Sequence, residues 1–262
     1  MRVSKSAFYH WQLRGAKIID HETWLLCHRM KTLFTESRQS LGSRQLMQQL
    51  RKEDFKIGRY RVISLMKQLG LSVKNKKRFV VTTDSRHKQP VAANLLNREF
   101  EPAEKNQIWT TDITNVWTLE GWVYLAVVMD LHSRQIIGWN TDRSMTTNLI
   151  ERALIKAVNI RRPSKGLMHH SDRGSQYASA AYQQLLKSHD MVCSMSRKGN
   201  CWDNAPTERF CSSLKREWLT GNVYTTREAA DTDIKSYMVY YNTRRLHTTL
   251  NNQTPVEFEQ CA

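Results

Sequence analysis

Residues 108–115 read Ile-Trp-Thr-Thr-Asp-Ile-Thr-Asn, and their pattern is the clearest indication of the fold class. Its side chains alternate, so that Thr110, Asp112 and Thr114 share one face, which is the period of a β-strand. The strongly apolar run at 122–129 predicts a second, buried strand. The two runs together predict a hairpin with Asp112 on its first strand.

After this hairpin, the sequence pattern indicates helices that alternate with strands. The expected elements are a third strand over 134–139, a helix at 146–159, a strand at 167–171, a helix at 178–188, a strand at 192–195, and helices at 206–219 and 226–241. Three consecutive strands followed by this alternation predict a mixed α/β fold with one central sheet.

The region before the hairpin is expected to be helical and basic. Apolar residues recur at helical spacing over 44–51 and over 62–69, with Gly58 between the two stretches. Gly70 ends the second stretch, and Leu71 follows where a C-cap contact is made. This pattern predicts a helix-turn-helix, although any small helical hairpin also has it.

The net charge points to a polyanionic partner. Lys and Arg number 40 against 24 Asp and Glu, a formal charge of +16, and cations gain affinity for DNA by releasing condensed counterions. A basic but unrelated soluble protein is the alternative. No apolar run has the roughly 20 residues of a membrane helix, and no secretory signal is apparent. We therefore expect a cytoplasmic, nucleoid-associated protein.

The five cysteines give little support to a zinc or redox site. They are scattered, no pair has the C-x-x-C spacing, and no histidine pair completes a zinc site. Reduced, mostly buried thiols are the preferred interpretation.

Three acids fall where the rim of an α/β sheet is expected. Asp112 lies on the first strand, Asp172 just beyond a later strand, and Glu208 in the first turn of a helix. Three convergent carboxylates cannot all remain ionised without a compensating cation. Mg²⁺ is the natural partner, because it takes oxygen ligands, keeps several waters and binds substrate phosphates.

Each acid also has an ordinary structural interpretation, as a turn residue or a helix-start residue. Asp130, Asp142 and Asp203 compete for the same role on weaker grounds. The joint spacing favours the first three. Residues 173–207 number 35 between Asp172 and Glu208.

At this point the chain resembles the catalytic core of retroviral integrases and related transposases. The motifs are Thr111-Asp112-Ile113-Thr114, His170-Ser171-Asp172-Arg173-Gly174-Ser175-Gln176-Tyr177 and Asn204-Ala205-Pro206-Thr207-Glu208, with the D,D(35)E spacing. More closely, it resembles the second-reading-frame product of two-frame, copy-out–paste-in insertion sequences. Further motifs that agree lie at 106–109, 196–204 and 241–255. Arg209 and Asn251-Asn252 depart from the usual pattern without touching the three acids.

The resemblance implies an RNase H-like fold with a mixed five-stranded sheet, preceded by a small all-α, helix-turn-helix-like module. The expected division is a helical region at 1–73, a basic linker at 74–103, the integrase core at 104–220, and a C-terminal helix with a basic tail at 221–262.

The resemblance also implies a DDE transposase that cleaves DNA at element ends and transfers the 3′-hydroxyl into DNA. Asp112, Asp172 and Glu208 are expected to hold two Mg²⁺ or Mn²⁺ ions, with Asp112 bridging both. Lys215, seven residues after Glu208 on the same helix face, is expected to hold a DNA phosphate. The other expected DNA contacts are Arg44, Arg59, Arg61, Lys76, Lys77, Arg78, Arg197, Lys198, Arg244 and Arg245.

The expected partners are element ends, target DNA and further copies of the chain, since two ends must be brought together. Trp202 beside the acids is a weaker candidate for stacking on an unpaired base. Two other functions stay open, a DNA-binding repressor without catalysis and a nuclease that acts on RNA–DNA hybrids.

Overall fold

The computed structural model describes residues 4–13, 20–73, 90–198 and 200–261. The chain divides into two compact units, Met1–Lys74 and Asn75–Ala262, which are described separately. Lys76, Lys77 and Arg78, predicted to contact DNA, lie outside the described residues. No helix in the described part of the chain is long and apolar enough to span a membrane.

The first unit is helical, as predicted. Its elements are α1 (Lys5–Leu13), α2 (His21–Glu36), α3 (Ser43–Lys52) and α4 (Arg59–Gln68). The last three helices share one apolar core that includes Met30, Leu46 and Val62, all fully buried. α1 buries none of its residues.

The turn and stop predicted around α4 are present. Gly58 precedes the helix in an extended conformation. At the other end Gly70 has φ +66°, a left-handed conformation that suits glycine. The N–H of Leu71 donates to the Met66 carbonyl at 2.8 Å, and the N–H of Gly70 donates to the Lys67 carbonyl at 3.3 Å. These two bonds form a Schellman motif, so a local signal terminates α4.

The second unit contains the predicted mixed sheet of five strands. They are β1 (Ile108–Thr118), β2 (Gly121–Asp130), β3 (Ile136–Asp142), β4 (Met168–Ser171) and β5 (Val192–Met195). The strand order is β3-β2-β1-β4-β5. β1, β2 and β3 pair antiparallel, whereas β4 pairs parallel with both β1 and β5.

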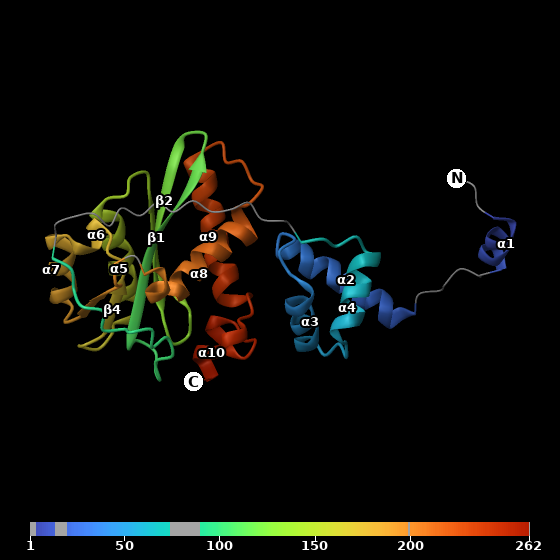
Figure 1. Ribbon diagram of the computed structural model, residues 1–262, viewed down its shortest axis with the longest axis horizontal. Helices are drawn as coiled ribbons and strands as arrows, with labels where there is room; N and C mark the ends of the chain where they lie inside the picture. Colours follow the sequence, from blue (N-terminus) through green and yellow to red (C-terminus); the bar gives the residue numbers. More distant parts are fainter. Residues whose placement is uncertain (1–3, 14–19, 74–89, 199, 262) are drawn as a thin grey trace. The chain divides into compact units, whose positions relative to one another are not determined.

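Helices cover both faces of the sheet. They are α5 (Thr147–Arg161), α6 (Ser175–Ala178), α7 (Ala180–Ser188), α8 (Ala205–Leu214), α9 (Arg227–Thr243) and α10 (Pro255–Cys261). Figure 1 shows α5, α6 and α7 on one side of β1 and α8 and α9 on the other. Two separate apolar cores match this arrangement, one with Trp109 and Leu154, the other with Leu125 and Tyr237.

Three segments differ from the predicted elements. The helix expected at 178–188 is divided at Ser179, where the backbone is extended. The Ser179 side chain caps α7 by accepting the backbone N–H of Tyr182. The helix expected at 206–219 is α-helical only as far as Leu214, and its last part, Lys215–Leu219, is a π-helical turn. The expected basic tail folds into α10, which carries Glu257 and Glu259.

Candidate active site

Asp112 lies on β1 just beyond the last residue that pairs with β4. That pairing runs only from Ile108 to Thr110, so beyond it this edge of β1 has no partner strand in the described sheet. The Asp112 side chain is half-buried, and its Oδ1 accepts the N–H of Ile113 at 2.8 Å. The predicted strand position of Asp112 is confirmed.

Asp172 is the first residue after β4, as the sequence predicts. Its Oδ1 accepts the N–H of Gly174 at 2.8 Å, which fixes the carboxylate within a tight turn. A Cβ at Gly174 would lie 3.0 Å from that same oxygen. Glycine therefore leaves room for the carboxylate where most residues would crowd it.

Glu208 lies in the first turn of α8, and two hydrogen bonds hold this turn against β1. The Thr207 hydroxyl donates to the Thr110 hydroxyl at 2.6 Å, and the Asn204 amide donates to the Thr111 carbonyl at 2.9 Å. Both acceptors are within two residues of Asp112. The helix start is thereby anchored beside the strand that carries the first acid.

The three acids influence one another electrostatically. Burial, and then the charges of Asp172 and Glu208, raise the pKa of Asp112 to about 8. Burial and Asp172 likewise raise the pKa of Glu208. Repulsion of this kind is relieved by a bound cation.

The acids do not form a complete ligand cage. Among the described residues, no group of three His, Cys, Asp or Glu side chains is arranged to enclose a metal ion. Mg²⁺ does not need such a cage, because waters and substrate phosphates complete its octahedral shell. The donor set, three carboxylates with one strongly raised pKa, fits a hard divalent ion.

Cys211 is a neighbour of the acids that no sequence motif singles out. Its thiol is buried beside Asp112, and burial together with the charge of Asp112 raises the thiol pKa well above its usual value. The thiol therefore stays neutral. It lies three residues after Glu208, a spacing that places both on one side of α8.

Lys215 also reaches this region. Its Nζ donates to Asn115 Oδ1 at 3.2 Å, and burial lowers its pKa although the charge of Asp112 acts in the opposite direction. The expected proximity of Lys215 to the acids agrees with this geometry, whereas its contact with DNA stays a prediction.

The remaining predicted DNA contacts fall into different settings. Arg44, Arg59 and Arg61 are exposed on α3 and α4 of the first unit. In the second unit Lys198 and Arg244 are exposed. Their exposure is compatible with DNA contact, which stays a prediction for these residues.

Arg197 and the competing acid Asp203 form a structural cluster. The Asp203 carboxylate is fully buried and accepts hydrogen bonds from Arg197 Nη2 at 2.8 Å and from Arg98 Nε at 2.9 Å. The hydrogen bonds from Arg197 lower the pKa of Asp203. This pairing explains why Asp203 stands apart from the acids, and it gives Arg197 a partner within the protein.

The prediction for Arg245 needs correction. Its guanidinium is 12% exposed and its Nε and Nη2 both donate to Glu217 at 2.8 Å. Tyr237 also donates to Glu217, at 3.2 Å. Burial alone would raise the pKa of Glu217, but Arg245 lowers it overall. Arg245 therefore ties the C-terminal segment to the π-helical turn and is poorly placed to contact DNA.

Other residues near the acids have packing roles. His170 lies between the hydroxyls of Ser194 at 2.9 Å and Ser196 at 3.2 Å, and burial lowers its pKa to about 4. Tyr177 is buried with its hydroxyl 3.3 Å from that of Thr111, in agreement with the predicted core position. Trp202 is 69% exposed.

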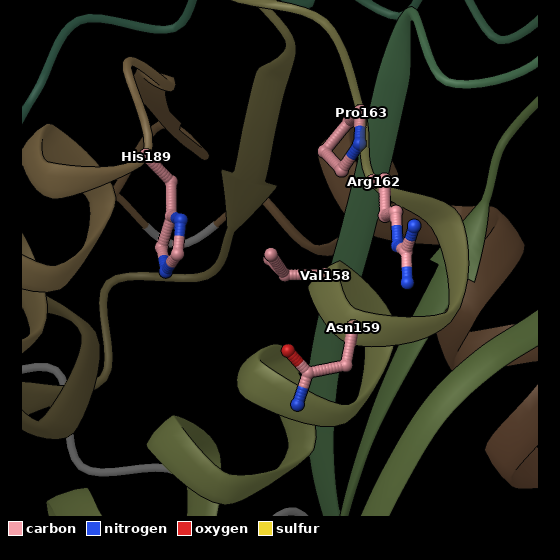
Figure 2. Close-up of a pocket in the computed structure, with 5 residues that line it drawn as sticks. All are labelled: Val158, Asn159, Arg162, Pro163 and His189. Atoms are coloured by element: carbon pink, nitrogen blue, oxygen red, sulfur yellow. The ribbon is translucent and has the colours of Figure 1, made fainter.

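A cavity of about 400 Å³ lies elsewhere, between the end of α5 and His189 after α7 (Figure 2). Its other lining residues are Val158, Asn159, Arg162 and Pro163. They precede β4, whereas Asp172 follows it, so the cavity is at the opposite end of that strand. With no carboxylate in its lining, the cavity is not the catalytic centre.

Thr207→Val is expected to loosen the attachment of Glu208. The substitution removes the 2.6 Å bond and leaves the buried Thr110 hydroxyl without its donor, a loss of about 1–3 kcal/mol. Urea unfolding measures this loss, and DNA cleavage should fall with it. Ser212→Ala, which removes an exposed hydroxyl from the same helix, is the control. Equal stability of both variants would contradict the anchoring role.

Comparison with known proteins agrees with this geometry. The integrase core domain family matches residues 102–201 and 189–255, and the HTH-like domain family matches residues 22–79. The chain is 39% identical over 259 residues to the insertion element IS600 uncharacterized 31 kDa protein of Shigella sonnei, covering 98% of this chain and 95% of that protein. It is 37% identical over 262 residues to transposase InsF for insertion sequence IS3A of Escherichia coli (strain K12), covering 99% and 91%.

Among solved structures, the fold resembles a chain of the simian T-cell lymphotropic virus intasome in complex with PP2A regulatory subunit B56 gamma. The TM-score is 0.53 at 15% identity, covering 88% of this chain and 74% of that one. This similarity agrees with the predicted integrase-like fold. The chain belongs to the family of insertion-sequence transposases with an integrase core domain, as the motifs around Asp112, Asp172 and Glu208 predict.

Proposed function

We propose that this transposase cleaves DNA at the ends of its insertion sequence and joins the freed 3′-hydroxyl to a second DNA strand, using Asp112, Asp172 and Glu208. The observation that carries the proposal is the convergence of these acids: two hydrogen bonds hold the start of α8 against β1 beside Asp112, and burial, followed by the charges of Asp172 and Glu208, raises the pKa of Asp112 to about 8. A protein of this charge, +16, would place such a cluster against DNA only if cations neutralise it.

Two Mg²⁺ or Mn²⁺ ions fit this donor set. Asp112, Asp172 and Glu208 would together hold them. When bound, such ions activate the attacking oxygen and stabilise the leaving oxygen of an in-line displacement. The carboxylates supply positioning and charge, and Lys215 is suited to hold the phosphate that is attacked.

The chemistry requires no nucleophilic side chain. In the first step water forms a bond to phosphorus, the bond to the 3′-oxygen breaks, and a 3′-hydroxyl is released. In the second step that hydroxyl attacks a phosphodiester of the target, and one P–O bond forms as another breaks. The number of phosphodiester bonds is unchanged in this step, so no nucleotide cofactor is consumed.

DNA binding is assigned to exposed cations in each unit. Arg44, Arg59 and Arg61 of α3 and α4 are candidates for contacts to the element end. Lys198, Arg244 and Lys215 are candidates for contacts near the acids. Because two ends must be joined, a dimer or larger assembly is expected on DNA. A DNA-bound mass of one chain and one end would contradict this.

The test uses a duplex that carries the terminal repeat of the encoding element, with Mg²⁺, Mn²⁺, Ca²⁺ or a chelator. Nicking at the end and joining to a second duplex are expected with Mg²⁺ and Mn²⁺, and chelation should stop both. Joining that survives chelation would overturn the metal assignment. Firm DNA binding with no cleavage under any condition would instead indicate a repressor without catalysis.

A further inference from the structure

Two exposed tryptophans face each other near the tip of the β1–β2 hairpin. Trp117 and Trp122 are direct cross-strand partners, with ring centroids 4.8 Å apart at 72°. Their exposed fractions are 56% and 42%, whereas Trp109 on the same face of β1 is fully buried. The sheet face that helices cover at Trp109 is thus uncovered at the tip.

This tryptophan pair lies on the same strand as the first catalytic acid. Five residues separate Trp117 from Asp112, which at about 3.3 Å per residue is a distance of about 17 Å. The odd separation places the two side chains on opposite faces of β1, so a DNA strand that meets both must pass around the edge of β1 that β4 leaves unpaired beyond Thr110. Nucleotides of one DNA strand are spaced by about 3.4 Å along the helix axis. A strand with its scissile phosphate at Asp112 could therefore reach Trp117 about five nucleotides away.

Two cations lie near the pair. Lys215 Nζ donates to Asn115, two residues before Trp117, and Arg227 Nε donates to the Trp122 carbonyl at 3.2 Å. Glu120 is the acid of this turn, and it accepts the backbone N–H of Arg227 at 2.9 Å. An aromatic surface close to cations suits a ligand with flat rings and a negatively charged backbone.

We propose that Trp117 and Trp122 hold an unpaired base of the DNA strand whose phosphate lies at Asp112. The proposal rests on the proposed function and extends it to the conformation of the substrate. Every base has an aromatic face, so the contact needs no particular sequence. A second copy of the chain would instead cover an apolar surface that also includes Leu119 and Val223, and the mass of the free protein tests that occupant.

The experiment compares a forked DNA, a duplex with a single-stranded arm of about eight nucleotides, with the same duplex made blunt. The full chain is titrated without divalent ions, and fluorescence anisotropy gives both affinities. Trp117→Ala and Trp122→Ala are expected to weaken binding of the forked DNA about tenfold and binding of the blunt duplex less than twofold. Trp117→Phe should retain most of the preference.

2-Aminopurine placed along the arm reports stacking directly. Its emission should be quenched most at about the fifth nucleotide from the junction, and the quenching should disappear in Trp117→Ala. Ile160→Ala removes a side chain that is 70% exposed at the end of α5 and is the matched control. Circular dichroism of each variant confirms that it is folded.

Three results would overturn base capture: equal losses on forked and blunt DNA, no loss in either alanine variant, or a lower mass of the free protein in Trp117→Ala. The last would make this face a contact between copies. Cleavage and joining by the wild type test the proposed function separately. If both reactions occur while the tryptophan variants bind like wild type, only the base-capture proposal fails.

Discussion

Asp112→Asn should abolish DNA cleavage and joining, by on the order of a thousandfold or more, while DNA binding remains. The amide keeps the shape of the side chain but lacks the negative charge that would hold a cation. A thousandfold loss corresponds to about 4 kcal/mol of transition-state stabilisation. Gel assays of nicking and joining measure the loss, and anisotropy measures DNA affinity. Residual activity near the wild-type level would contradict the assigned role of Asp112.

The same substitution should stabilise the protein when no metal is present. The pKa of Asp112 is raised from 3.8 to about 8, so the folded state binds a proton that the unfolded chain releases. The stability of the wild type should therefore fall as the pH rises from about 4 to about 8 in chelating buffer. Asp112→Asn removes this dependence and should raise the melting temperature at pH 8 by about 3 °C or more.

Added Mg²⁺ should make the wild type melt at a higher temperature than Asp112→Asn, the reverse of the order without metal. A ligand that binds only the folded state raises its stability, so Mg²⁺ is expected to raise the melting temperature of the wild type and not that of the variant. Asp142→Asn is the control, because Asp142 lies at the end of β3 and accepts the N–H of Ser144. This control should keep activity and the response to Mg²⁺. A variant that responds to Mg²⁺ like the wild type would contradict the metal assignment.

The positions of the acids could be predicted because local rules determine them. Alternation fixes the face of β1 that carries Asp112. The end of β4 and the start of α8 fix Asp172 and Glu208, and strand ends converge with helix starts at the rim of such sheets. The sequence pattern could not show the hydrogen bonds that hold α8 to β1, since Thr207 and Thr110 are 97 positions apart.

The role of the basic residues could not be predicted from local pattern. Arg98 and Asp203 are separated by 105 positions and Arg245 and Glu217 by 28, so neither pairing has a periodic signature. A positive charge in sequence is equally compatible with a DNA contact and with a buried ion pair. The division at Ser179 was missed for another reason, because the Ser179 side chain caps the next helix and overrides a continuous helical pattern.

Arg245→Ala should destabilise the protein by about 3–5 kcal/mol, because it leaves the Glu217 carboxylate buried without its cation. For a chain of this size that corresponds to a decrease of about 10 °C in melting temperature. Calorimetry or urea unfolding measures the change. The neighbouring Arg244 is exposed, and Arg244→Ala should change stability by less than about 0.5 kcal/mol.

The two arginines thus compare a buried charge that stabilises the fold with an exposed charge that is a candidate for DNA contact. Replacing both members of the pair, as Arg245→Met with Glu217→Leu, should recover much of the lost stability, since no buried charge then lacks a partner. Under salt titration, Arg244→Ala should reduce the slope of affinity against salt by about one phosphate contact. Arg245→Ala should not change that slope. If Arg245→Ala kept full stability and lost DNA affinity, the buried pair would be a minor interaction and Arg245 a DNA contact after all.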